Sequence, residues 1–476
     1  MAARAQPPPA SFDPAAFETF RFVSRDLDER GEVTLRYALE DGPEFTERIS
    51  LPVGETLDAA RRQSLEGLLS LLHLLAGVSY YKTALPARVS FESGAPGPAV
   101  ARLLEALYSE GLGELAYVNG LPRLPRPRFQ AGGEGPAPPA PPRAGARVRS
   151  GAATPAEAAT PGGEPRRVLV PVGGGKDSAV AIEAVRAAGL ETALFSLGDA
   201  APIARTVEVA ELPWLIARRQ LDPLLFDLNA AGALNGHVPV TAIVTAVAVL
   251  TAAVHGFDTV ALANERSASA GNVGFDGVVV NHQFSKSLAA ERLFSAALAE
   301  LGAGVRQLSV LRGASELAIA RAFAGMERYH AAFTSCNAIF RIDPDLRASS
   351  WCRDCPKCRF VFLALAPFVE PSRLTTIFGG DMLADERQYE GFALLAAGGG
   401  HKPFECVGEE QESLAAMRLL AADERWREHA VVRRLAAEML PAHPLPEGDP
   451  AAALALGDDH DVPARLLGGV RAVLGA

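Results

Sequence analysis

The sequence lacks two features that would point to a secreted or a nucleic-acid-binding protein, namely a disulfide framework and an excess of positive charge. It has only five cysteines in 476 residues, and four of them lie in one region. Such clustering in a long chain is unlike the cysteine spacing of small secreted domains. The formal net charge is −10, which disfavours a phosphate-backbone partner. We therefore expect no nucleic-acid partner.

Long hydrophobic segments are also scarce. Residues 1–10 contain prolines and no apolar signal-peptide core. The only long apolar run, 238–254, is short for a membrane span and carries Pro239 near its start. We expect it to be a buried helix of an α/β layer. With neither a signal nor a span, the sequence predicts a cytoplasmic protein, and its length suits about two to four domains.

What the sequence does contain is a strong phosphate-binding pattern at residues 168–178, Val-Leu-Val-Pro-Val-Gly-Gly-Gly-Lys-Asp-Ser. The β-branched run predicts a buried strand. Gly173, Gly174 and Gly175 then permit a tight turn and a close approach of the backbone to a ligand. The alanine-rich segment after them predicts a helix that ends at Gly189. A turn at a helix N-terminus binds anions, because free N–H groups and the helix dipole point at the ligand.

Two common phosphate-binding motifs do not fit this stretch. Walker A requires Ser or Thr after its lysine, whereas Lys176 is followed by Asp177. The Rossmann fingerprint requires a third glycine where Ser178 stands. The stretch instead resembles the pyrophosphate loop, Ser-Gly-Gly-x-Asp-Ser, of the PP-loop ATPases, with Gly173 in place of the first serine. That resemblance implies cleavage of ATP between its α- and β-phosphates. The alternative is an ordinary glycine-rich turn.

The composition divides the chain into four regions. The sequence of residues 11–121 indicates a small α+β domain, with an antiparallel meander followed by amphipathic helices. Residues 122–165 are rich in Pro, Gly and Ala and predict a flexible linker. Residues 166–409 form the predicted catalytic domain. Residues 410–476 predict a helical C-terminal region, in which we identify no chemical motif.

The first region also holds an aromatic pair that could serve a site. The meander is expected at 17–52 and helices at 57–75 and 100–109. Between the helices lie Tyr80-Tyr81-Lys82. These side chains either contact a polar ligand, such as a sugar or nucleotide, or pack at an interface with the second domain.

Strands and helices alternate in the catalytic region. Strands are expected at 191–197, 214–217 and 259–263, and helices at 207–212 and 239–256. This order predicts an α/β fold with a doubly wound parallel sheet. The resemblance of the loop to the PP-loop ATPases implies the adenine nucleotide alpha hydrolase-like form of this fold. Ligands of such sheets lie at the carboxyl ends of the strands. We therefore expect Ser196, Glu265 and Arg266 near the glycine turn. Glu265 would hold Mg²⁺ or orient substrate and Arg266 would meet a phosphate, with a surface ion pair as the alternative.

A polar loop at 281–287, Asn-His-Gln-Phe-Ser-Lys-Ser, supplies further candidates. Loops beside a sheet edge often carry substrate contacts. His282 and Lys286 are therefore candidate acid–base or phosphate-binding groups. The alternative for His282 is a purely structural role.

Four cysteines, Cys336, Cys352, Cys355 and Cys358, have the spacing of a metal site. Two residues separate each successive pair of the last three, and 15 residues lie between the first two. This pattern suits one tetrahedral ion, and zinc is the natural choice in a reducing compartment. Four thiolates leave no open position, so the zinc would be structural. The alternatives are four reduced thiols without metal, or an iron–sulfur cluster.

The whole chain resembles the UDP-N-acetyl-α-D-muramoyl-L-alanyl-L-glutamate epimerases of bacterial peptidoglycan synthesis. The resemblance runs from about residue 12 to past residue 420, excluding the linker. The stretches that carry it are 73–82, 171–178, 235–241, 264–267, 281–287, 350–358 and 402–408. A second resemblance, to 7-cyano-7-deazaguanine synthase, rests on the loop and the four cysteines. That family places its first cysteine closer to the others and has a shorter chain.

The first resemblance implies ATP-dependent conversion of the terminal L-glutamate of UDP-MurNAc-L-Ala-L-Glu to D-glutamate. One of its carboxylates is adenylated and pyrophosphate leaves; the Cα proton is then removed and returned on the other face. Adenylation cancels a negative charge that would oppose enolate formation, as pyridoxal phosphate or a metal does elsewhere. Hydrolysis then releases AMP. The expected cofactors are ATP and Mg²⁺, and the expected partner is this muramoyl nucleotide.

Roles follow for the loop. The N–H groups of Gly173, Gly174, Gly175 and Ser178 would cradle the β- and γ-phosphates while Lys176 neutralises developing charge. Asp177 would hold Mg²⁺ or cap the helix, and Ser196 would lie near the adenosine. The epimerising base is left open among five candidates: Cys406, His282, Lys286, His401 and Lys402. The alternatives are another PP-loop adenylating enzyme, either deazaguanine synthase-like or tRNA-modifying, and a non-catalytic nucleotide-binding or metal-scaffold protein.

Overall fold

The computed structural model describes residues 11–131, 163–340, 347–348, 350–396, 404–405, 407–445 and 448–475. The chain forms two compact units, each assembled from segments that are distant in sequence. Unit 1 comprises Met1–Leu169, Ile216–Val260 and Ala290–Gln307. Unit 2 comprises Val170–Leu215, Ala261–Ala289 and Leu308–Ala476.

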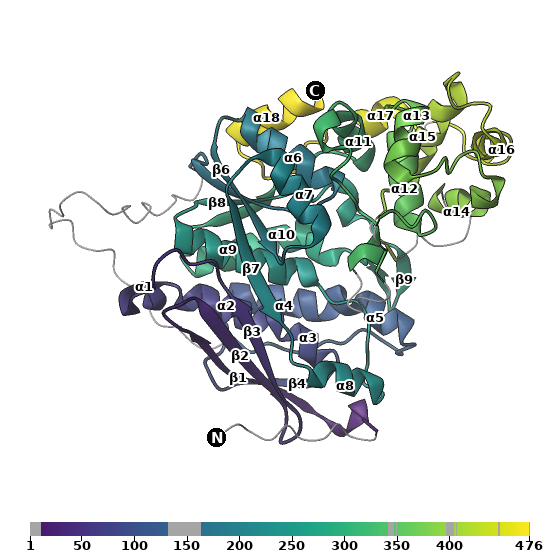
Figure 1. Cartoon of the computed structure of the whole chain (residues 1–476). Coiled ribbons are helices and arrows are strands. Elements are labelled where there is room, and N and C mark those ends of the chain that lie inside the picture. Colours follow the sequence, from purple (N-terminus) through teal and green to yellow (C-terminus); the bar gives the residue numbers. More distant parts are fainter. Residues whose placement is uncertain are drawn as a thin grey trace, which may run out of the picture. The chain divides into compact units, whose positions relative to one another are not determined.

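Unit 1 begins with the predicted antiparallel meander (Figure 1). Its strands are β1 (Thr19–Leu27), β2 (Glu32–Leu39) and β3 (Glu44–Ser50). β2 pairs in antiparallel fashion with β1 on one side and β3 on the other. Buried and more exposed residues largely alternate along these strands, because one face of the meander packs into the core.

The helix predicted at 57–75 is two helices that meet at Leu65, and the helix predicted at 100–109 is confirmed with a small change at its start. The helical elements of unit 1 are α1 (Ala59–Ser64), α2 (Glu66–Ala76), α3 (Val78–Tyr81), α4 (Pro98–Ser109), α5 (Gly113–Val118), α8 (Leu224–Ala230) and α9 (Val240–His255). A short strand, β4 (Arg88–Phe91), runs parallel to β1. α10 (Leu288–Glu300) lies mostly in unit 1.

Helix α9 is the buried helix predicted from the long apolar run. Pro239 precedes its first residue, and Gly256 ends it with a φ of 72°. Ten of its residues are buried, since apolar side chains occur on every side of the helix. Within the described part of the chain, none of the helices combines the length and the apolar character needed to cross a bilayer.

A large, mostly parallel sheet carries the fold, in the strand order β11-β8-β5-β6-β7-β3-β2-β1-β4. Its further strands are β5 (Arg167–Pro171), β6 (Glu191–Leu197), β7 (Trp214–Gln220), β8 (Thr259–Leu262) and β11 (Arg306–Ser309). β5 runs parallel to β8, whereas β3 is antiparallel to β7. The predicted α/β class is confirmed, but the meander belongs to the same sheet. The predicted domain boundaries stay predictions.

The aromatic pair at positions 80 and 81 belongs to the core of unit 1. Tyr80 and Tyr81 are 0% and 1% exposed. Tyr80 stacks on Tyr37 with ring centroids 5.1 Å apart, and Tyr81 meets Phe20 edge-on at 5.8 Å. The structure therefore does not support contact of these rings with a ligand. Packing, the alternative, accounts for them, and this packing is inside unit 1.

Unit 2 contains the predicted glycine turn and the helices that surround it. Its regular elements are α6 (Lys176–Ala187), α7 (Ala201–Ala210), β9 (Val273–Phe275), β10 (Val278–Val280), α11 (Glu316–Ala324), α12 (Pro356–Leu365), α13 (Pro371–Phe378), α14 (Tyr389–Ala393), α15 (Glu410–Ala422), α16 (Ala430–Glu438), α17 (Pro450–Leu454) and α18 (Ala464–Leu474). α18 packs against α6, and α15 packs against α12 (Figure 1).

The predicted helix at 207–212 was placed too late in the sequence. Helix α7 begins at Ala201, because Pro202 is well suited to the first turn of a helix. It ends before Glu211, which has a left-handed φ of 54°. Most of the predicted linker, residues 132–162, lies outside the described residues, as do residues 1–10, so the predictions for both segments stay predictions.

The buried histidine of α2 gives the stability of unit 1 a defined pH dependence. Burial lowers the pKa of His73 to about 4. As the pH falls below about 6.5, the unfolded chain binds a proton at this residue while the folded chain does not. We expect the wild-type protein to lose about 2 kcal/mol of unfolding free energy between pH 7 and pH 5 through this histidine.

Urea unfolding at the two pH values, compared between wild type and His73→Leu, measures this contribution. The variant should show the smaller difference between pH 7 and pH 5. Equal differences in the two proteins would contradict the assignment.

Candidate functional site

The glycine turn between β5 and α6 has the geometry of an anion site. Gly174 has a φ of 81°, and a Cβ there would lie 2.7 Å from the backbone carbon of Pro202. A Cβ on Gly175 would lie 2.6 Å from Ser335 Oγ. Gly174 therefore requires glycine, whereas a side chain at position 175 would have to displace the Ser335 hydroxyl. Within the described part of the chain, the N–H groups of Gly174 and Gly175 donate no hydrogen bond, so they are available to a ligand.

Two other predicted contacts of the loop are occupied by the protein. The N–H of Gly173 donates to Ser178 Oγ at 3.0 Å, which closes the turn. Ser196 lies buried in β6, where its hydroxyl donates to the carbonyl of Gly198 and accepts from Trp214 Nε1 at 2.9 Å. Its placement near an adenosine stays a prediction.

Lys176 is the first residue of α6 and is completely buried. Its Nζ lies 2.5 Å from Asp177 Oδ1 and forms an ion pair with Glu316 Oε2. Burial alone would lower the pKa of this lysine, but the two carboxylates outweigh burial and raise it. The ammonium therefore stays charged at neutral pH. Asp177 pairs with this lysine, and Gly175 occupies the N-cap position.

Glu316 holds Lys176 from the opposite side. It is the first residue of α11, whose N-cap is Ser315. Burial would raise the pKa of Glu316, but the charges of Lys176 and Lys357 lower it to about 2. Lys357 Nζ lies 3.6 Å from Glu316 Oε1. The carboxylate thus stays ionised between two lysines.

The C-terminal region, in which the sequence shows no motif, supplies a further carboxyl group. Glu412 Oε1 accepts the backbone N–H of Glu316 at 2.9 Å, and Oε2 accepts that of Glu409 at 2.8 Å. Burial and the charges of Glu316 and Glu409 raise the pKa of Glu412 to about 8. This carboxyl is therefore mostly neutral at pH 7, and it anchors the start of α11 by hydrogen bonding.

Glu265 is the predicted site residue that remains open to a ligand. It is 5% exposed, and within the described residues its carboxylate has no hydrogen bond or ion pair within 4.0 Å. Burial and the charges of Glu316 and Asp177 raise its pKa to about 7. Its position is fixed through the backbone, since Arg312 Nη1 donates to the Glu265 carbonyl at 2.9 Å.

Lys286 and Arg266 act on different carboxyl groups of the site: the charge of Lys286 acts on Glu265 and Glu316, and that of Arg266 acts on Glu412. Arg312 Nη2 donates to the Lys286 carbonyl at 2.6 Å, and Lys286 contributes to the electrostatics of Glu265 and Glu316. The Arg266 side chain instead lies against the C-terminal segment, with Nη1 3.5 Å from the carbonyl of Ala455. His282 is half-buried, and its backbone N–H donates to Asn272 Oδ1 at 2.8 Å.

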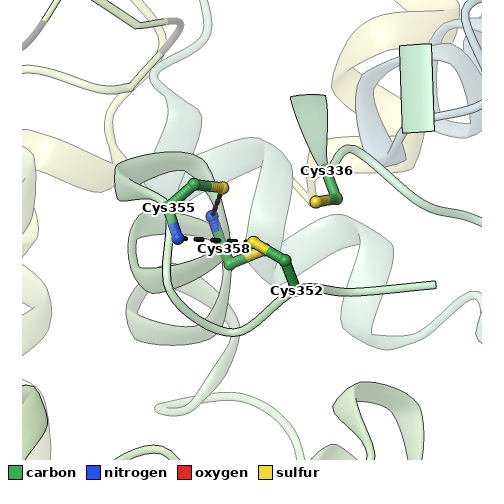
Figure 2. A group of neighbouring side chains, drawn as sticks. All are labelled: Cys336, Cys352, Cys355 and Cys358. Atoms are coloured by element: carbon green, nitrogen blue, oxygen red, sulfur yellow. Dashed lines mark hydrogen bonds between the residues drawn. The ribbon is translucent and has the colours of Figure 1, made fainter. Parts of the chain in front are cut away.

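The four cysteines predicted as a metal site do come together, as Figure 2 shows. Their Sγ atoms all lie within 4.8 Å of one another. Cys336 faces the loop that carries the other three, and the N–H groups of Cys355 and Cys358 donate to Cys352 Sγ and Cys355 Sγ. The Cys352 and Cys358 sulfurs are 3.6 Å apart, which excludes a disulfide between them.

This donor set fits a tetrahedral ion. Four ligands at the usual zinc–sulfur distance would have sulfurs about 3.8 Å apart, and the observed spacing needs little adjustment. Cys336 and Cys358 are buried, and Cys352 and Cys355 are partly exposed. The hydrogen bonds to two of the sulfurs are those expected for thiolate ligands.

Sequence reasoning missed four residues of this site: Arg312, Glu316, Lys357 and Glu412. Glu316 and Glu412 carry no motif, and each reaches the site by folding from a distant segment. Lys357 could have been found, because it lies between Cys355 and Cys358, where a charged side chain is placed by the cysteines. Three further candidates, Cys406, His401 and Lys402, lie outside the described residues.

Comparison with known proteins identifies the family. Residues 11–309 match the model of the MurL N-terminal domain, and residues 332–447 match that of the MurL C-terminal domain. The UDP-N-acetyl-alpha-D-muramoyl-L-alanyl-L-glutamate epimerase of Salinispora tropica is 46% identical over 426 residues, 88% of either chain. The enzyme of the same name from Xanthomonas oryzae pv. oryzae is 41% identical over 97% of this chain and 99% of its own.

No solved structure matches the chain. The relatives are named as epimerases, and both parts of the family model are present in the expected order. The chain is therefore an isomerase that belongs to the family of UDP-N-acetyl-α-D-muramoyl-L-alanyl-L-glutamate epimerases.

Proposed function

We propose that this enzyme epimerises the terminal L-glutamate of UDP-MurNAc-L-Ala-L-Glu in peptidoglycan synthesis, using ATP to activate a glutamate carboxylate. The observation that carries the ATP requirement is the glycine turn, where two N–H groups that donate no hydrogen bond within the described residues lie beside the buried ammonium of Lys176. Family membership supports the substrate and the epimerisation. A PP-loop fold is part of the same proposal.

In this mechanism the turn binds the β- and γ-phosphates. The N–H groups of Gly174 and Gly175 donate to phosphate oxygens, and those of Gly173 and Ser178 complete the cradle once the turn opens. Lys176 moves from Glu316 toward the oxygen that bridges the α- and β-phosphates, and it stabilises the charge that develops on pyrophosphate. Ser196 lies on the adenosine side.

Asp177 and Glu265 are the carboxylates that would hold Mg²⁺. Oxygen ligands suit this ion, and when bound it would neutralise charge on the phosphates. Glu265 suits this role because no cation of the protein pairs with it within 4.0 Å in the described part of the chain. Arg266 would meet a phosphate only after leaving the carbonyl of Ala455.

The chemistry balances as follows. A substrate carboxylate oxygen attacks the α-phosphorus, and pyrophosphate leaves with the bond electrons. The mixed anhydride carries no charge on its acyl group, so a base can remove the Cα proton to form an enolate. A proton returns to the opposite face, and water cleaves the anhydride to the D-glutamyl product and AMP.

Lys286 is our first choice for one of the proton-transferring groups. Arg312 holds its backbone beside Glu265, and its ammonium donates to Gln283 Oε1 at 3.1 Å. His282 lies four residues away in the same loop. Cys406, His401 and Lys402 stay candidates for the group on the other face.

The four cysteines would hold a structural zinc ion. When bound, it would fix the loop of Cys352–Cys358 to the segment of Cys336, with no open position for substrate. The same donor set also accepts an iron–sulfur cluster, which metal analysis distinguishes from zinc.

The direct test mixes the purified protein with ATP, Mg²⁺ and UDP-MurNAc-L-Ala-L-Glu. We expect AMP, pyrophosphate and a product whose acid hydrolysate contains D-glutamate. A deazapurine acid or tRNA in place of the muramoyl nucleotide should release no AMP. AMP formation with either of these would favour the alternative PP-loop enzymes, and no AMP with any substrate would favour a scaffold.

Removing the loop lysine should stop activation. In Lys176→Ala, we expect AMP formation to fall by roughly 100- to 1,000-fold, since a cation is lost where charge develops. AMP release, read by chromatography, measures the loss. Arg186→Ala, in the last turn of the same helix, is the matched control and should keep its activity. Wild-type turnover in Lys176→Ala, with a normal melting temperature, would refute the loop assignment.

Removing the proposed proton-transfer group should separate activation from epimerisation. We expect Lys286→Met to keep ATP-dependent pyrophosphate release but to lose incorporation of deuterium at Cα from heavy water. Mass spectrometry of the glutamate reports the exchange. If Lys286→Met exchanges Cα–H at the wild-type rate, Lys286 is removed from the list and His282 becomes the next variant.

Metal removal should destabilise unit 2. We expect about one zinc ion per chain by elemental analysis, and a melting temperature at least about 5 °C lower after treatment with a chelator. Re-addition of zinc should restore it. An unchanged melting temperature after complete metal loss would contradict a structural zinc.

A further inference from the structure

The scarcity of lysine in this chain draws attention to where lysine is used. Of 46 Lys and Arg residues, only five are lysines: Lys82, Lys176, Lys286, Lys357 and Lys402. Arginine thus supplies nearly every solvated positive charge. The two residues differ in chemistry, because the lysine ammonium is a compact point charge that suits phosphate oxygens from any direction. Each lysine is therefore a candidate for a role that arginine does not fill.

Three of the five lysines interact electrostatically with the carboxylate of Glu316. Lys176 and Lys357 both contact Glu316, and the charge of Lys286 also lowers the pKa of Glu316. The neighbouring Glu412 is mostly neutral at pH 7, because burial raises its pKa to about 8. Lys176, Lys286 and Lys357 thus lie among the carboxyl groups of Asp177, Glu265 and Glu316, and their ammonium groups are the cations that an anionic ligand would meet there.

Lys357 has no role in the mechanism above, yet its side chain is largely buried beside Glu316. Its side chain is 9% exposed. Within the described residues, Nζ has no hydrogen bond; its ion-pair partner, Glu316 Oε1, is 3.6 Å away, and the Glu316 carboxylate also pairs with Lys176. An ammonium has three N–H donors, and in the described part of the chain no protein acceptor forms a hydrogen bond with those of Lys357. An oxygen ligand in the site would satisfy them.

The cysteine site fixes the position of Lys357. Cys355 is the N-cap of α12 and Cys358 lies in its first turn, so the lysine stands between two sulfur ligands. Its backbone N–H donates to Glu405 Oε2 at 3.1 Å. The segment of Cys336 reaches the glycine turn as well, since the N–H of Thr334 donates to the Gly174 carbonyl at 2.9 Å.

We propose that Lys357 is a second anion-binding residue of the active site and that the four-cysteine site serves to hold it there. The ligand is an anionic oxygen, which comes either from a nucleotide phosphate or from the glutamate carboxylate of the substrate. The inference rests on the proposed function, because it places this ligand beside Lys176 and Glu316.

The test compares Lys357→Met, which keeps the length and removes the charge, with Lys357→Arg, which keeps the charge. Arg359→Met is the matched control, because it removes a cation from the same helix that pairs with Asp354 and not with Glu316. Three quantities are measured for each: zinc per chain, the Kd of a non-hydrolysable ATP analogue, and the KM for UDP-MurNAc-L-Ala-L-Glu.

We expect Lys357→Met to keep its zinc and to raise one of the two binding constants by roughly 10- to 100-fold, as loss of a charged hydrogen bond would. A raised Kd for the ATP analogue assigns Lys357 to phosphate, and a raised KM with normal Kd assigns it to the carboxylate. Lys357→Arg should recover part of the loss. Wild-type values of both constants in Lys357→Met would overturn the proposal.

The role of the cysteines is tested by Cys355→Ser and by chelation of the intact wild-type protein, which covers the case of a variant that does not fold. Either treatment should raise the binding constant that Lys357→Met raises. Combining either treatment with Lys357→Met should cause little further change in that constant. Metal loss that leaves both constants unchanged would overturn this part. Failure of the proposed function is distinct, because the wild-type protein itself would then form no AMP.

Discussion

The buried ion pair between Lys176 and Glu316 is the interaction on which the rest of unit 2 depends. Removing two charges from water costs several kcal/mol for each, so such a pair persists only when further groups satisfy it. Asp177 and Lys357 supply opposite charges, and Glu412 binds the N–H at the start of α11. Five side chains from α6, α11, α12 and α15 are thus held together by the need to neutralise these buried charges. The same contacts keep the Lys176 ammonium at the glycine turn.

Local patterns in the sequence predicted much of this site. The order of strand, glycine turn and helix at 168–189 places Lys176 correctly, because each step depends on residues a few positions apart. The cysteine spacing likewise predicts a cluster, since three of the four cysteines share one short loop. Glu316 and Glu412 could not be predicted, because their partners lie 140 and 96 residues away in sequence and only folding brings them together. Arg312 carries no signal, as it binds backbone carbonyls.

The sheet shows the same limit at a larger scale. The alternation of strands 191–263 predicted an α/β fold, but nothing in residues 19–50 predicts that β3 pairs with β7 across 170 residues of chain. Ile49 and Arg219 face each other in that pairing, and Arg219 also binds the buried carboxylate of Glu47 with both Nε and Nη2. The composition predicts an N-terminal domain at 11–121, and its boundaries stay a prediction; the pairing shows that the strands of this region belong to the main sheet.

The hydrogen bond from the backbone N–H of Glu316 to the Glu412 carboxyl has a consequence for folding during synthesis of the chain. A ribosome delivers the glycine turn early, but the carboxyl that anchors α11 emerges only after a further 230 residues or so. Until then, the backbone N–H at the start of α11 lacks its acceptor. The ion pair of Lys176 with Glu316 therefore gains its complete surroundings only after the segment of α15 has been synthesised.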